Sequence, residues 1–156
     1  MNTLDRNLTV FEAHCLINQH KFEAYNFSDF EYGERIIRTA DGEDFALITI
    51  EDSVVDEVGA IIAEIYESDA PAREQIQRFN SVFGLACDPI NEKALDPLVR
   101  VICPFCKTKE VSYRAAKPIR YKSFSIPVIT HQKWAMMSHG QKRSVIEKGL
   151  RLKGLL

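Results

Sequence analysis

Features that mark several common protein classes are scarce or missing in this chain. Only 7 of its 156 residues are glycine, 6 are proline and 4 are cysteine, which excludes collagen, low-complexity disorder and a disulfide-dense mini-protein. No apolar run approaches the roughly 18 to 20 residues that cross a bilayer, so we expect no membrane partner. The first six residues lack the basic start and apolar run of a signal peptide, which indicates a cytoplasmic protein.

Motifs that mark common enzymes are missing as well. The sequence contains no glycine-rich phosphate loop, no G-x-S-x-G and no H-E-x-x-H. We therefore expect a non-catalytic, accessory or regulatory protein.

Each of the two parts of the chain contains few charges of one sign. Residues 1–106 contain eight basic and 20 acidic residues, a net charge of −12, whereas residues 107–156 contain 12 basic and two acidic residues, a net charge of +10. Lysine and arginine at this density displace counterions from a phosphate backbone, so the basic part is expected to contact nucleic acid or a nucleic-acid-bound complex. The residues expected to do so are Lys107, Lys109, Arg114, Lys117, Arg120, Lys122, Arg143, Lys148 and Arg151.

The charge pattern has two other interpretations. The acidic N-terminal region can bind a protein partner, as in an inhibitor, immunity protein or adaptor module. Alternatively, the two parts cancel each other by packing together within one chain or by pairing in a homodimer.

The apolar pattern predicts an α+β fold in which a small antiparallel sheet is flanked by helices. Residues 35–38 and 45–50 predict a β-hairpin with an Asp-Gly turn, and the second strand, apolar on both faces, is expected to be central. Residues 21–31 are aromatic-rich without a clean period and are expected as loop or short strand. Helices are expected to begin near Ser53 and Pro71, and a first helix is predicted by the spacing of Leu4, Leu8, Phe11 and Cys15.

The domain organisation expected from these patterns has three parts. They are an acidic α+β core domain (1–87), a linker bounded by two Asp-Pro turns (88–97) and a basic C-terminal region (98–156). In the basic region we expect short strands over 98–102, 110–114 and 122–129, the first two forming a hairpin. Two short helices are expected to follow, the second with a capping box at Ser138 and Gln141.

The most specific motif is Cys103-Pro104-Phe105-Cys106. Two thiolates separated by two residues can point at one tetrahedral ion, and over residues 101–109 the sequence resembles one knuckle of a zinc ribbon. The second Cys-x-x-Cys that a ribbon carries 15 to 20 residues further on is missing. A structural zinc site therefore needs two more ligands, from this chain or from a second copy in a dimer.

The expected additional zinc ligands are Cys87, at the start of the linker, and His131, at a helix start. His139 is also close in sequence, whereas His14, Cys15 and His20 are more distant. On the predicted first helix, Cys15 is expected as a small core residue, and His14 and His20 are expected at or near the surface.

Cys-Pro-Phe-Cys followed by Lys also resembles a glutaredoxin active site. The resemblance implies a thiol-disulfide oxidoreductase with Cys103 as nucleophile and Cys106 as resolving thiol. In that family a helix follows the motif, and a βα unit comes before the strand that starts with a cis-proline. Only 20 residues separate Cys106 from Pro127, which is too few for that unit.

Overall fold

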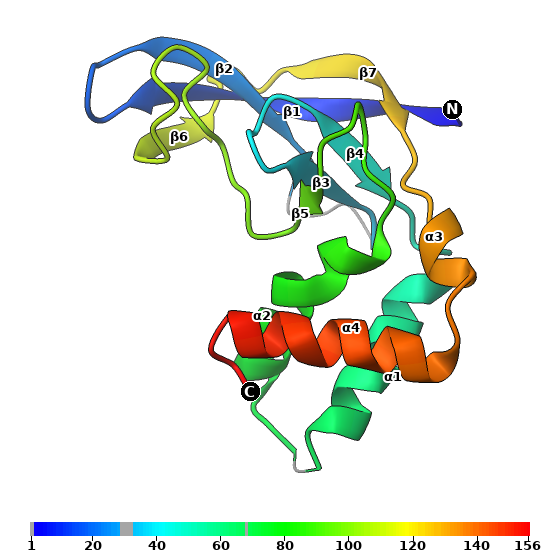
Figure 1. Ribbon diagram of the computed structural model, residues 1–156. Coiled ribbons are helices and arrows are strands. Elements are labelled where there is room, and N and C mark those ends of the chain that lie inside the picture. Colours follow the sequence, from blue (N-terminus) through cyan, green and yellow to red (C-terminus); the bar gives the residue numbers. More distant parts are fainter. Residues whose placement is uncertain (1, 29–32, 68) are drawn as a thin grey trace. The chain divides into compact units, whose positions relative to one another are not determined.

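The structure of the protein, a computed structural model, describes residues 2–28, 33–67 and 69–156. In this part of the chain it combines small antiparallel sheets with four α-helices, so the predicted α+β class is confirmed (Figure 1). The chain divides into two compact units. Unit 1 comprises residues 1–50 and 99–128, and unit 2 comprises residues 51–98 and 129–156.

This division differs from the one expected from the sequence. Residues 99–128 belong with the N-terminal strand β1 (Thr3–Cys15), because β6 (Val111–Ala115) and β7 (Tyr121–Pro127) both pair antiparallel with it. Residues 88–97, expected as a linker, belong to unit 2, where Ile90 and Leu95 are buried. Strands so distant in sequence show no local sequence pattern that predicts their pairing.

The prediction of a first helix over Leu4 to Cys15 is wrong, because these residues lie in strand β1. Side chains four residues apart share a face in a strand as well as in a helix, so the spacing of Leu4 and Leu8, and that of Phe11 and Cys15, fits either element. Neighbouring strands pair with both edges of β1, and residues 8–10 are buried on both of its faces. At these three residues the alternation that identifies a half-buried strand is interrupted, whereas burial alternates over residues 3–7.

Strand β1 is the centre of a four-stranded sheet in unit 1. One edge pairs with β2 (Lys21–Asn26), and the other pairs with β6 and then β7. Residues 116–120 form a bulge between these two strands. Val10 closes its base by donating its N–H to the carbonyl of Arg120 (3.0 Å) and accepting the N–H of Ala116 (3.1 Å).

The predicted hairpin is confirmed as β3 (Arg35–Thr39) and β4 (Phe45–Ile48). Its turn contains Gly42 at φ 74°, a backbone conformation that favours glycine. Strand β4, expected as a central strand, pairs with β3. It also forms one isolated parallel bridge, from Leu47 to Val128. Leu47 packs with Leu8 and Ile126 in the core of unit 1.

Unit 2 is mainly helical. Its helices α1 (Ser53–Ile65), α2 (Ala72–Val82) and α4 (His139–Leu152) contact one another. The 3-10 helix η1 (Phe83–Ala86), strand β5 (Leu95–Asp96) and helix α3 (Gln132–Ala135) complete it. The predicted capping box at Ser138 and Gln141 is present, and α1 begins at Ser53 as expected, with Asp52 as its cap. Among the described residues, no helix is both long and apolar enough to cross a membrane.

Candidate metal centre

A tight turn connects β1 to β2 and lies between Cys15 and His20. Cys15 donates its N–H to the carbonyl of His20 (2.8 Å), and its own carbonyl accepts the N–H of Gln19 (3.0 Å). Gln19 has φ 59°. The N–H of Asn18 donates to the Cys15 Sγ (3.2 Å).

The turn that holds the Cys-x-x-Cys motif repeats this backbone pattern. Cys103 donates its N–H to the carbonyl of Thr108 (3.0 Å), and its own carbonyl accepts the N–H of Lys107 (2.9 Å). Lys107 has φ 62°. The segments 15–20 and 103–108 are thus two turns of the same kind, each with a left-handed residue four positions after a cysteine.

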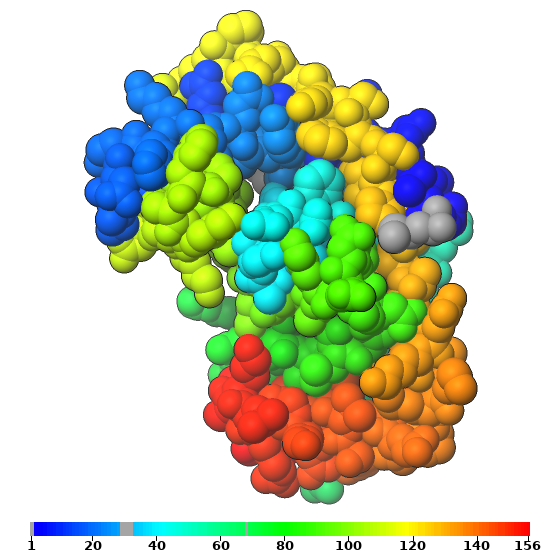
Figure 2. All heavy atoms as spheres, turned by 45° about the horizontal axis from the view of Figure 1, so that its top comes forward, coloured from blue at the N-terminus to red at the C-terminus, as the bar shows by residue number. Residues whose placement is uncertain are grey.

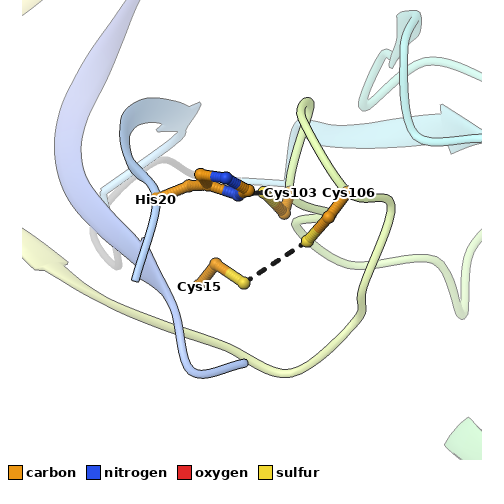
Figure 3. Close-up of side chains that lie close together, drawn as sticks. All are labelled: Cys15, His20, Cys103 and Cys106. Atoms are coloured by element: carbon orange, nitrogen blue, oxygen red, sulfur yellow. Dashed lines mark hydrogen bonds between the residues drawn. The ribbon is translucent and has the colours of Figure 1, made fainter. Parts of the chain in front are cut away.

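The two turns bring four metal-binding side chains together in unit 1 (Figure 3). The Cys15 and Cys106 sulfurs are 3.4 Å apart, and the Cys103 sulfur is 3.5 Å from Nδ1 of His20. All four donor atoms lie within 4.8 Å of one another. The cysteines are free thiols, so these four residues lie close enough to bind a metal ion.

The spacing of the donor atoms matches a tetrahedral ion. Bonds of about 2.3 Å to sulfur and about 2.0–2.1 Å to nitrogen place neighbouring ligand atoms roughly 3.5–3.8 Å apart. The Cys15–Cys106 distance of 3.4 Å and the Cys103–His20 distance of 3.5 Å are close to these values. Cys15 and Cys103 are fully buried, and the Phe105 ring lies 5.1 Å from the His20 ring. The cluster is therefore shielded from water on part of its surface.

Cys103 and Cys106 are two of the four residues predicted as metal ligands, and the other two lie elsewhere. Cys87 and His131 belong to unit 2, whereas the cluster belongs to unit 1. Burial and the nearby carboxylates of Asp52 and Asp88 raise the pKa of Cys87 to about 12, so it stays a protonated thiol. His131 is held by Asp52 and the Ala86 carbonyl.

Cys15 and His20, and not Cys87 and His131, lie beside Cys103 and Cys106, although both were expected in other roles. The signal that could have identified them is a cysteine at the end of a strand, followed by a turn-forming Asn-Gln pair and a histidine. Predicting a helix over β1 concealed this signal, because a helix places Cys15 in its apolar stripe. The strand expected over residues 98–102 before Cys103 is absent, so the hairpin of a zinc-ribbon knuckle is not formed.

The Cys-x-x-Cys motif does not lie at the start of a helix. Residues 103–106 form a turn, and the next element along the chain is β6. The strand–motif–helix order that the glutaredoxin resemblance implies is therefore absent from this segment.

The nine basic residues expected to contact nucleic acid are divided between the two units. Those from Lys107 to Lys122 belong to unit 1, and Arg143, Lys148 and Arg151 belong to unit 2. Four are already in ion pairs: Lys107 with Glu43, Arg120 with Glu23, Arg143 with Glu64, and Arg151 with Glu147. Within the described part of the chain, no ion pair involves Lys109, Arg114, Lys117, Lys122 or Lys148.

Comparison with known proteins gives no relative for this chain, since no protein-family model, no curated protein sequence and no solved structure matches it.

Proposed function

We propose that Cys15, His20, Cys103 and Cys106 bind a structural zinc ion, and that the protein is an accessory or regulatory factor and not an enzyme. The observation that carries this proposal is the convergence of four donor atoms within 4.8 Å from two turns of the same backbone pattern. Three thiolates and one imidazole are a typical ligand set for structural zinc. Four protein ligands leave no coordination position for a substrate.

The proposed ion would join segments that are far apart in the sequence. One turn follows β1, and the other precedes β6, which pairs with β1 over residues 11–15. Coordination would therefore fix the end of the sheet in unit 1. Since all four ligands come from one chain, a second copy is not needed to complete the site.

Metal analysis of protein purified without chelator tests the proposal. We expect about one zinc per chain, measured by plasma mass spectrometry. The Cys106→Ser variant should lose most of it, because a hydroxyl replaces one of four ligands. Cys87→Ser is the matched control and should retain the full content. Metal-free wild-type protein, or equal zinc in both variants, would contradict the proposal.

A second proposal is that unit 1 contacts single-stranded nucleic acid through β6, β7 and the bulge between them. Tyr113 and Tyr121 are 41% and 63% exposed there, and exposed aromatic rings stack on bases. Arg114 and Lys117, exposed in the same segment, form no ion pair with described residues. These two groups are free to pair with phosphates.

The salt dependence of oligonucleotide binding tests this second proposal. Replacing Arg114 and Lys117 with glutamine should lower the slope of log Kobs against log salt by about 0.7 for each lost phosphate contact. The control is Arg151→Gln, which removes a residue paired with Glu147 and should leave the slope unchanged. Absence of binding by wild-type protein would instead favour a role for the acidic residues in binding a protein partner.

A further inference from the structure

Unit 1 contains an open cleft of about 460 Å³ that lies beside the proposed metal site and shares Cys103 with it. Its walls come from β2, the β3–β4 hairpin, β7 and the 103–108 turn. In Figure 2 a gap separates the cyan hairpin from the blue and yellow-green segments. The volume lies within the range of about 300–1,000 Å³ that is usual for small-molecule sites.

Aromatic rings form much of the cleft wall. Tyr25 and Phe124 meet at 4.8 Å between ring centroids, and Phe124 meets Phe45 at 5.6 Å, both edge to face. Phe22 also lines the cleft. All four side chains are only partly buried. A planar ligand in the cleft can therefore stack on these rings or contact their edges.

Arg38 supplies a positive charge with unused hydrogen-bond capacity in this cleft. Its Nη2 donates to the carbonyl of Tyr25 (2.7 Å), and its guanidinium lies 5.8 Å from the centre of the Phe45 ring. No carboxylate among the described residues pairs with it. Burial lowers the pKa of Arg38 from its ordinary value, yet an arginine remains charged in proteins. An anion that forms two parallel hydrogen bonds would satisfy this planar group.

The acidic side chains around the cleft do not supply that anion, because each has a partner of its own. The pairs are Asp41 with the Thr39 hydroxyl, Glu43 with Lys107, and Glu23 with Arg120. A second cation, Lys122, lies 5.2 Å from the Tyr25 ring and 5.3 Å from the Phe124 ring. Like Arg38, it forms no ion pair with the described residues.

We propose that this cleft binds a planar aromatic anion, with a nucleoside monophosphate as the chemical class. The phosphate would pair with the guanidinium of Arg38, and the base would lie against the rings of Tyr25, Phe45 and Phe124. A free nucleotide and a nucleotide within a single strand share this chemistry. The proposal requires neither the zinc ion nor the contact through Arg114 and Lys117.

Titration calorimetry on the full, metal-loaded chain tests the proposal. The probes are the four ribonucleoside monophosphates, inorganic phosphate and a five-residue oligouridylate. We expect at least one monophosphate to bind and inorganic phosphate to bind at least about tenfold more weakly, because phosphate lacks the ring. Tighter binding of the oligonucleotide identifies a single strand as the source, and preference for the monophosphate identifies a free nucleotide.

Two variants and a control assign the binding to the cleft. Arg38→Gln should weaken binding at least about tenfold, as expected for the loss of a hydrogen bond from a charged group. Arg38→Lys, which keeps the charge and removes the planar fork, should also weaken it and replaces the first variant if that one fails to fold. Arg73→Gln removes an exposed charge from α2 in unit 2 and should leave binding unchanged.

Three results would overturn the proposal. They are no binding of any nucleotide, equal affinity for inorganic phosphate and nucleotides, or unchanged affinity in a folded Arg38 variant. The zinc content of each sample is measured in parallel. A sample that retains zinc and binds no nucleotide therefore contradicts only the cleft proposal. A metal-free sample that binds nucleotide contradicts only the zinc proposal.

Discussion

The hydrogen bonds of His131 should make the stability of unit 2 depend on pH. Its Nδ1 lies 2.6 Å from the Ala86 carbonyl, and its Nε2 lies 2.7 Å from a carboxylate oxygen of Asp52. Only a doubly protonated imidazole donates to both acceptors. Burial lowers the pKa of His131, but the hydrogen bonds to Asp52 and Ala86 and the negative charges of Asp52 and Asp88 together raise it by more, so the net pKa is above its ordinary value.

The sign of the pH dependence follows from this raised pKa. Stabilisation by the His131 imidazolium is fully present below the pKa of the unfolded chain, about 6.5. It is lost as the pH rises through the higher pKa of the folded protein. Hydrogen bonds that involve a charged group contribute about 1.5–3 kcal/mol each. The glutamine of His131→Gln can still form one of these two hydrogen bonds. The substitution should therefore lower the unfolding free energy by roughly 2–3 kcal/mol at pH 5.

Urea unfolding followed by tryptophan fluorescence measures this effect, because Trp134 is the single tryptophan of the chain and is buried in unit 2. The difference between wild type and His131→Gln should shrink between pH 5 and pH 8.5. His139→Gln is the control, since His139 forms an exposed pair with Glu64 and should change stability little. A difference that stays constant, or grows with pH, would refute the assignment of a charged His131.

Three further substitutions test the packing, each by urea unfolding. Gly42→Ala should destabilise unit 1 by about 1–3 kcal/mol, because it places an alanine at a positive φ and the added Cβ would lie 2.8 Å from Ile102. An unchanged unfolding free energy would contradict the turn geometry. Asp88→Ala should cost unit 2 about 1–2 kcal/mol, since Asp88 accepts two N–H groups at the start of α3; an unchanged midpoint would refute that cap. Gly149→Ala should cost about 1–3 kcal/mol, because its Cβ would lie 2.6 Å from a Leu85 methyl group; a gain in stability would show that the helices separate easily there.

Elements with local signals could be predicted from the sequence. The hairpin turn at Asp41-Gly42, the apolar stripe of α1 and the capping box of α4 each depend on residues within one or two turns of chain. Strand β1 was not predicted in this way, although Phe11 to Cys15 alternate between apolar and polar residues. Its burial comes from partners about 100 residues further along the chain, and spacings of four residues do not distinguish a strand from a helix.

Only half of the Cys/His cluster could be predicted from the sequence, for the same reason. Cys103 and Cys106 are two residues apart and form a recognisable motif, whereas Cys15 and His20 reach them through the pairing of β1 with β6. The choice of Cys87 and His131 depended on closeness in sequence, which the fold does not follow. Arg38, which pairs with no carboxylate among the described residues, had no local signal, because the fold decides which carboxylates lie near an arginine.

X-ray absorption at the zinc edge of the purified protein tests whether Cys15, His20, Cys103 and Cys106 hold a zinc ion. We expect three sulfur ligands at about 2.3 Å and one nitrogen ligand at about 2.0–2.1 Å. We also expect His20→Cys to convert the spectrum to four sulfur ligands without loss of zinc. A wild-type spectrum with oxygen ligands or fewer than three sulfurs, or one that His20→Cys leaves unchanged, would contradict it.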